Sequence, residues 1–156
     1  MFQGFQVMSW FRNKKFPAIE DLAGEDQWMV AQGEHDGRPM LVRVNTSAKA
    51  YAGHPGLPVR LGIAVPFHAP RADGMPEKAE SQQLGAIEDR VFEVLGTGGR
   101  VVLVITTGGM REFVSYVRSR EIAAELAQAV KAATTTHEVQ HYVDDDPAWK
   151  VYQQFV

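Results

Sequence analysis

The amino-acid sequence predicts an α+β fold in which an N-terminal β-hairpin and a short C-terminal helix are added to a βαββαβ core. Three observations support this prediction: an Asp-Gly turn between two β-type segments, six core segments after it, and an Asp-Pro pair before the aromatic C-terminus. The core order is strand, helix, strand, strand, helix, strand, which is a split βαβ arrangement with both helices on one face. We therefore expect a ferredoxin-like core.

The N-terminal hairpin is predicted at residues 27–34 and 39–45, which are joined by His35-Asp36-Gly37-Arg38. Asp and Gly both tolerate the positive φ angles of a tight turn. Residues 45–58 are rich in Gly, Pro, Ser and Ala, and they indicate a loop between the hairpin and the core.

The first half of the core is predicted between residues 59 and 96. From Val59 to Phe67, bulky apolar residues alternate with smaller or more polar ones, which is typical of a strand with one buried face. Pro76 suits the first position of a helix, and Gly96 ends it. The expected inner stripe of this helix consists of Leu84, Ile87, Val91, Val94 and Leu95.

The second half of the core begins with a continuously apolar run, 101–105, which indicates a strand covered on both faces. A Gly-Gly turn leads into a strand at 111–118, and Ser119 can cap the next helix. The expected inner stripe of that helix consists of Ile122, Leu126, Ala129, Val130 and Ala133. Residues 138–144 form the last strand, and Asp146-Pro147 starts the C-terminal helix, whose aromatic residues are Trp149, Tyr152 and Phe155.

The apolar run at 101–105 requires cover on both faces of the sheet, although a bare ferredoxin-like sheet leaves one face open to water. The C-terminal helix, the N-terminal hairpin and arm, or a second copy of the chain could supply this cover. We expect cover from within the chain, and a homodimer is the alternative.

Length and composition predict a single domain. The chain has 156 residues, of which 45% are hydrophobic and 22% are charged, as in ordinary globular proteins. We assign residues 1–25 to an N-terminal arm and 26–156 to one α+β domain. Trp10, Phe11 and Phe16 are expected to pack back on that domain, with contact to a membrane surface as the alternative.

Charge and cysteine content disfavour several classes of partner. The net charge of −3 is not that of a typical nucleic-acid-binding domain, and no stretch approaches the length of a membrane span. The chain has no cysteine, so it lacks disulfides and thiolate metal ligands, which fits a reducing compartment. We expect a cytoplasmic protein without a cofactor, nucleic-acid partner or membrane attachment.

One segment matches a catalytic motif. His137-Glu138-Val139-Gln140-His141 has the His-Glu-x-x-His pattern of zinc metallopeptidases, in which two histidines one helical turn apart bind one ion. Threonines before the segment and its β-branched and aromatic residues favour a strand, where four residues span about 13 Å. We therefore predict no catalytic or metal-binding residue here, and a zinc-dependent hydrolase is the alternative.

Three arginines form a second candidate group. Arg43, Arg111 and Arg118 could bind an anion if their strands are neighbours, although strand arginines usually face solvent. Solvent exposure is the simpler expectation.

Several short motifs resemble one bacterial family. They are residues 28–44 with the turn Gly33-Glu34-His35-Asp36-Gly37-Arg38-Pro39, Gly74-Met75-Pro76 before a helix containing Ile87-Glu88-Asp89, residues 106–116, and residues 146–152. In this order the motifs resemble the bacterial family called domain of unknown function 695. The chain is also distantly similar to RraB-type regulators, which inhibit ribonuclease E and have a ferredoxin-like fold. The resemblance implies a protein-binding regulator.

The sequence therefore favours a non-enzymatic protein-binding or regulatory domain. Aromatic residues and arginine dominate the energetics of protein interfaces, so we expect the contact surface where these residues gather. The candidate partner-binding residues are Arg111, Phe113, Tyr116, Asp146, Trp149 and Tyr152. Trp149 and Tyr152 have a second interpretation as core residues.

Overall fold

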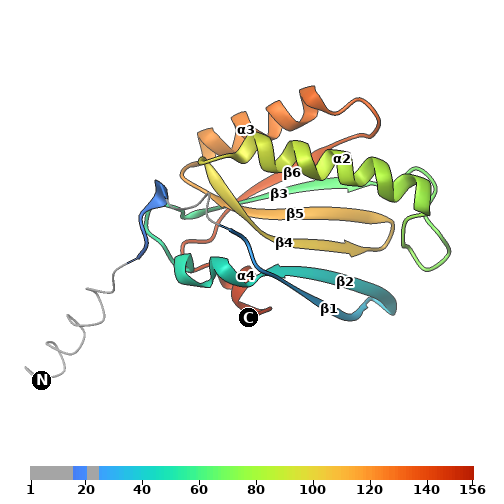
Figure 1. Ribbon diagram of the computed structural model, residues 1–156, viewed down its shortest axis with the longest axis horizontal. Helices are drawn as coiled ribbons and strands as arrows, with labels where there is room; N and C mark the ends of the chain where they lie inside the picture. Colours follow the sequence, from blue (N-terminus) through green and yellow to red (C-terminus); the bar gives the residue numbers. More distant parts are fainter. Residues whose placement is uncertain (1–15, 21–24) are drawn as a thin grey trace, which may run out of the picture.

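The computed structural model describes residues 16–20 and 25–156, and these residues form one six-stranded antiparallel sheet with helices packed against it (Figure 1). The α+β class is confirmed. In chain order the elements are β1 (Trp28–His35), β2 (Arg38–Asn45), the 3₁₀ helix η2 (Thr46–Tyr51), β3 (Val59–Pro66), α2 (Lys78–Leu95), β4 (Gly99–Thr107), β5 (Met110–Val117), α3 (Arg120–Ala133), β6 (Gln140–Asp145) and α4 (Lys150–Gln153).

The strands lie in the order β1-β2-β4-β5-β3-β6, and every neighbouring pair is antiparallel. The N-terminal hairpin joins the sheet through β2, which pairs with β4 from Met40↔Thr107 to Val44↔Leu103. Because two strands extend the sheet beyond β4, the whole sheet does not have the simple four-stranded order. Strands β1 and β6 form its two edges.

The two hairpin turns have the backbone conformation that their residues favour. Asp36 and Gly37 have φ angles of 52° and 75°, and Gly108 and Gly109 have φ angles of 59° and 80°. Left-handed values at both central positions give the twist that connects antiparallel strands, so both predicted hairpins are confirmed.

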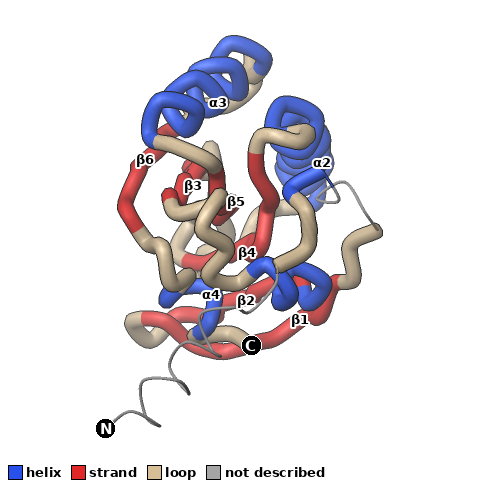
Figure 2. The backbone as a smooth tube through the Cα atoms, turned by 90° about the vertical axis from the view of Figure 1, so that its left-hand side faces the viewer, coloured by secondary structure: helices blue, strands red, loops and turns tan. Residues whose placement is uncertain are grey.

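Helices α2 and α3 cover the same face of the sheet (Figure 2). Side chains from β3, β4 and β5 meet the buried stripe of α2, which consists of Leu84, Ile87, Val91 and Leu95. The buried stripe of α3 is Ala123, Ala127 and Val130, whereas the predicted inner residues Ala129 and Ala133 are exposed. The helix is therefore rotated from its expected orientation, because small alanines on two faces leave the apolar stripe ambiguous.

The opposite face of the sheet has its own core, formed by residues within the chain. Trp149 and Tyr152 from the C-terminal segment pack with Leu57 and Tyr51 against Val102, Leu103 and Tyr116. The expected cover from within the chain is therefore present. The predicted loop at 45–58 contains η2, whose Ala48 and Tyr51 are buried in this core.

The C-terminal helix begins later than predicted. Helix α4 starts at Lys150, and Trp149 precedes it with a left-handed φ of 56°. The Asp146 carboxylate accepts hydrogen bonds from the backbone N–H groups of Lys150 and Val151, at 2.9 and 3.2 Å. Asp146 therefore caps α4 across an intervening turn, and Pro147 is not its first helical residue.

Most of the predicted N-terminal arm, including Trp10 and Phe11, lies outside the described residues. In the described part, Phe16 lies against His54, with ring centroids 5.2 Å apart, and Ile19 contacts the second core. Neither long helix in the described ranges has the length and apolar character needed to cross a bilayer.

Candidate functional site

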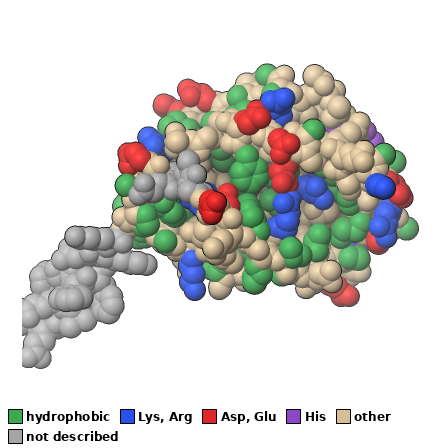
Figure 3. Space-filling model, viewed as in Figure 1, with side chains coloured by type: hydrophobic (Ala, Val, Ile, Leu, Met, Phe, Trp, Pro, Cys, Tyr) green, Lys and Arg blue, Asp and Glu red, His purple; other side chains and the backbone are tan. Residues whose placement is uncertain are grey.

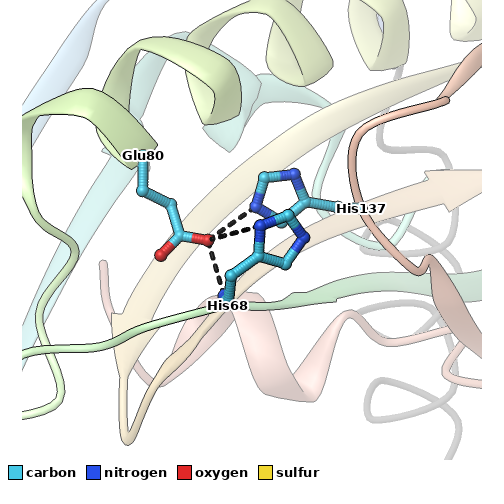
Figure 4. A group of neighbouring side chains, drawn as sticks. All are labelled: His68, Glu80 and His137. Atoms are coloured by element: carbon cyan, nitrogen blue, oxygen red, sulfur yellow. Dashed lines mark hydrogen bonds and ion pairs between the residues drawn. The ribbon is translucent and has the colours of Figure 1, made fainter.

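A cluster of two histidines and one glutamate lies at one end of the sheet (Figure 4). His68 follows β3, Glu80 lies in the first turn of α2, and His137 precedes β6. Strands β3 and β6 are antiparallel, with Ala64 opposite Gln140, so the segment entering β6 lies beside the segment leaving β3. The register of the sheet therefore brings the two histidines together.

The Glu80 carboxylate is the centre of this cluster. Its Oε2 lies 2.7 Å from Nε2 of His137 and 3.8 Å from Nδ1 of His68. The backbone N–H groups of His68 and Ala69 donate to the same carboxylate, at 2.6 and 3.4 Å. The two imidazole rings are stacked, with centroids 3.9 Å apart and planes 8° from parallel.

Glu80 and His137 are buried, whereas the side chain of His68 is 55% exposed. Burial by itself raises the pKa of Glu80, but hydrogen bonds from the His68 backbone, His137 and the Ala69 backbone outweigh it, so the pKa lies below its ordinary value. An ionised carboxylate only accepts hydrogen bonds, so Nε2 of His137 is the donor. Its Nδ1 lies 3.0 Å from the Thr136 hydroxyl.

The cluster has donor atoms suited to metal binding. One nitrogen or oxygen from each of the three side chains lies within 4.8 Å of the others. Imidazole and carboxylate are the usual nitrogen and oxygen ligands of zinc and related ions. Within residues 16–20 and 25–156, this is the one group of three or more such side chains.

A second candidate site lies along edge strand β1. We define the β1 surface as Trp28, Met29, Val30, Arg43 and Arg111. Val30 lies opposite Arg43 in the sheet register, so their side chains share the helix-side face. The Arg43 guanidinium lies over the Trp28 ring, 5.9 Å from its centroid.

Charged groups on the β1 surface are only partly compensated. Arg43 donates hydrogen bonds to both carboxylate oxygens of Glu88 on α2. The nearby Arg111 donates its Nε–H to the Thr106 hydroxyl at 2.9 Å, and among the described residues it has no carboxylate within salt-bridge distance. Burial and the charge of Arg43 lower the pKa of Arg111, and Glu88 opposes this shift. On this side of the molecule, acidic and basic side chains meet among hydrophobic ones (Figure 3).

Comparison with known families adds one finding. Residues 26–156 match the family of unknown function DUF695. The chain belongs to this family. No curated protein and no solved structure matches the chain. The matched residues of this DUF695 domain include the whole His-Glu-His cluster and the β1 surface.

The His-Glu-x-x-His segment of the DUF695 domain does not have the helical form that a zinc metallopeptidase motif requires. His137 lies in a bend before β6, while His141 lies within β6 opposite Ile63 of β3, so residues 137–141 form no helix. Glu138 and His141 are exposed, and neither belongs to the cluster. His137 instead meets His68 and Glu80. The one sequence signal for this was Glu80 itself, a charged residue four positions before Leu84 on the buried stripe of α2.

Five of the six candidate partner-binding residues are buried. Phe113 lies in the core beneath the helices, and Tyr116, Asp146, Trp149 and Tyr152 meet in the opposite core, all with 5% exposure or less. Arg111 is the half-buried exception. Of the three arginines that could form an anion site, Arg43 and Arg111 are neighbours, whereas Arg118 contacts the Thr97 carbonyl elsewhere.

Proposed function

We propose that the protein is a non-enzymatic, protein-binding or regulatory module of the cytoplasm, and that it binds an extended protein segment along β1. One observation carries the proposal. Among the described residues, the large hydrophobic side chains classed as exposed are Met29, Val30 and Val156, and two of these are neighbours in an edge strand. Exposed apolar residues on a free edge are typical of a strand that pairs with another chain.

The two sheet edges differ in a way that supports this choice. Edge strand β6 has six residues and carries Asp144 and Asp145, which pair with Arg60 and Arg120. Edge strand β1 has eight residues, and Trp28–Gly33 contains no charge and no proline. Charges and prolines are the usual means of preventing edge pairing. The first six residues of β1 lack them.

The chemistry of the β1 surface indicates what the partner segment contains. Val30 and the Trp28 ring offer apolar contacts on the helix-side face, and Met29 offers one on the other. Farther along β1, Gln32 and Gly33 line a surface pocket of about 300 Å³. Arg111 supplies a half-buried positive charge that pairs with no carboxylate in the described part of the chain. The proposed partner is therefore an extended segment with alternating apolar residues and an acidic side chain that reaches Arg111.

The proposal retains Arg111 from the residues selected on sequence grounds. The other five candidate partner-binding residues are buried in the two cores. They could contact a partner directly only if these cores opened. The regulatory part of the proposal rests on the sequence motifs alone, which suggest a distant resemblance to RraB-type regulators. We also propose that β3 to β6 are ferredoxin-like, which is supported by their order β4-β5-β3-β6 and by helices α2 and α3 between them. The absence of cysteine supports a cytoplasmic location.

A displayed library of random peptides tests the proposal. We expect enriched peptides to alternate apolar residues and to include Asp or Glu. In fluorescence anisotropy, Val30→Lys and Arg111→Ala should each weaken binding of a synthesised peptide by at least about tenfold, equivalent to about 1.4 kcal/mol. Val156→Lys is the matched control, because Val156 is also an exposed apolar residue but lies at the C-terminus.

Two outcomes would contradict the proposal. Enriched peptides that bind wild type and Val30→Lys equally well would remove the β1 edge as the site. A wild-type dimer in sedimentation velocity that dissociates in Val30→Lys would assign the same edge to a second copy of the chain instead.

A further inference from the structure

We propose that His68, Glu80 and His137 bind one divalent transition-metal ion of the zinc type. This site lies at the end of β3 and the start of α2, and it is independent of the proposed binding along β1. The ligand set is two imidazoles and one carboxylate, which is a combination found in zinc sites that keep a position open for water.

The ligand atoms are already close to the separations that a shared ion requires. Two atoms bonded to one zinc at about 2.1 Å lie at most about 4.2 Å apart. Glu80 Oε2 meets this limit with both His137 Nε2 and His68 Nδ1, at 2.7 and 3.8 Å. All three ligand atoms lie within 4.8 Å of one another. Both pairs that include Glu80 therefore meet the distance limit, and the separation of the two imidazole nitrogens depends on the orientation of the His68 ring.

Two of the three ligands are held in place by further contacts. The His68 and Ala69 backbone N–H groups orient the Glu80 carboxylate, and the Thr136 hydroxyl contacts the second ring nitrogen of His137. Hydrogen bonds of this kind orient the ligands in protein metal sites. On binding, the His137 proton would move from Nε2 to Nδ1, where the Thr136 hydroxyl oxygen can accept a hydrogen bond from it. The neutral imidazole would then bind the ion through Nε2, and the ion would lie between imidazole and carboxylate.

The third ligand, His68, must rotate its imidazole ring before it can bind the ion. In the stacked pair, the planes of His68 and His137 are 8° from parallel, so their in-plane lone pairs do not converge on one point. His68 is free to rotate out of the stack because its side chain is 55% exposed, whereas that of His137 is 0% exposed. The same exposure leaves a solvent-facing position for a water ligand.

Zinc binding by the purified full chain tests this proposal, with His68→Ala as the main variant, because an exposed side chain is dispensable for folding. After equilibrium dialysis against Zn²⁺, elemental analysis should find about one zinc per wild-type chain. His68→Ala should weaken zinc binding by at least about tenfold, the lower end of the effect of removing even an outer contact. Zinc should raise the thermal midpoint of the wild type but not that of His68→Ala.

His141→Ala is the matched control, because His141 belongs to the His-Glu-x-x-His pattern but not to the cluster. It should bind zinc as the wild type does, and excess Mg²⁺ should not displace the zinc, because imidazole is a poor ligand for magnesium. The proposal is overturned if the wild type binds no zinc, if His68→Ala binds it with wild-type affinity, or if His141→Ala loses it.

Discussion

Asp146 and Glu80 are both buried carboxylates, but only Glu80 lies beside a largely exposed imidazole, that of His68. Asp146 accepts hydrogen bonds from the Tyr116 hydroxyl at 2.7 Å and from Arg60 at 3.2 Å, in addition to the two backbone N–H groups at the start of α4. Glu80 is bonded to His137 and to two backbone N–H groups, and the exposed imidazole of His68 lies beside it.

This difference separates a structural carboxylate from a candidate functional one. Every neighbour of Asp146 named above is a donor that the fold itself supplies, so the group is satisfied without a ligand. At Glu80, the adjacent imidazole of His68 is 55% exposed, so burial does not hold it in place. Burial and a lowered pKa are common to both groups, so neither property alone indicates function.

The largest effect on stability is expected for substitution of Asp146. Asp146→Ala removes the α4 cap and leaves the Arg60 guanidinium and the buried Tyr116 hydroxyl without this acceptor. We expect a loss of about 3–5 kcal/mol in the free energy of unfolding, measured by urea denaturation. A loss below about 1 kcal/mol would show that the network contributes little.

Glu80→Ala should have a smaller effect on stability. The substitution leaves the His137 imidazole and the backbone N–H groups of His68 and Ala69 without their acceptor, but no arginine is left unpaired. We expect a loss of about 1–3 kcal/mol by the same measurement. If Glu80→Ala is more destabilising than Asp146→Ala, the ranking of the two networks is wrong.

Acid should weaken both networks. Burial raises the pKa of Asp146, but hydrogen bonds from Tyr116, the α4 backbone and Arg60 outweigh it, so its pKa is lowered, as is that of Glu80. A lowered folded pKa stabilises the fold above the ordinary values of 3.8 and 4.5, and this stabilisation is lost as the pH falls through the folded pKa. The urea concentration at the unfolding midpoint should therefore decrease as the pH is lowered from about 5 to about 3.

The control for the acid effect is Asp146→Asn, which has no carboxylate to protonate at this position. Its urea midpoint should change less with pH than that of the wild type. A wild-type midpoint that is constant or rises on acidification over this range would contradict the prediction.

The smallest effect is expected for His68→Ala. The side chain is mostly exposed, and the backbone N–H of His68, which bonds Glu80, is retained in the variant. We expect a change within about 0.5 kcal/mol in the absence of metal. Calorimetry of the metal-free protein checks this, and a change above about 2 kcal/mol would mean that the stack with His137 is a structural contact.

Local patterns were sufficient for most elements of the fold. The Asp36-Gly37 turn, the alternation after Val59 and the Ser119 cap each depend on residues a few positions apart, and each is present in the structure. The predicted inner stripe of α3 was partly wrong, because Ala129 and Ala133 are apolar yet exposed. The predicted start of the C-terminal helix at Pro147 was also wrong, because Asp146 caps a helix that begins at Lys150.

The candidate sites were far less predictable. Aromatic content selected Trp149 and Tyr152 as contact residues, but a sheet with two apolar faces needs large side chains to cover its second face. The β1 surface was missed because its exposure depends on β1 being the edge strand, which follows from the pairing of β2 with β4.

The sequence by itself determined where strands, turns and helices occur, because apolar periodicity and turn residues act over short distances along the chain. Only the tertiary structure decided which edge stays open and which titratable groups meet. Glu80 lies 12 residues from His68 and 57 from His137, and they are brought together by the antiparallel pairing of β3 with β6 and the docking of α2 on the sheet. Such contacts depend on the pairing of strands that are far apart in the chain, which local patterns do not encode.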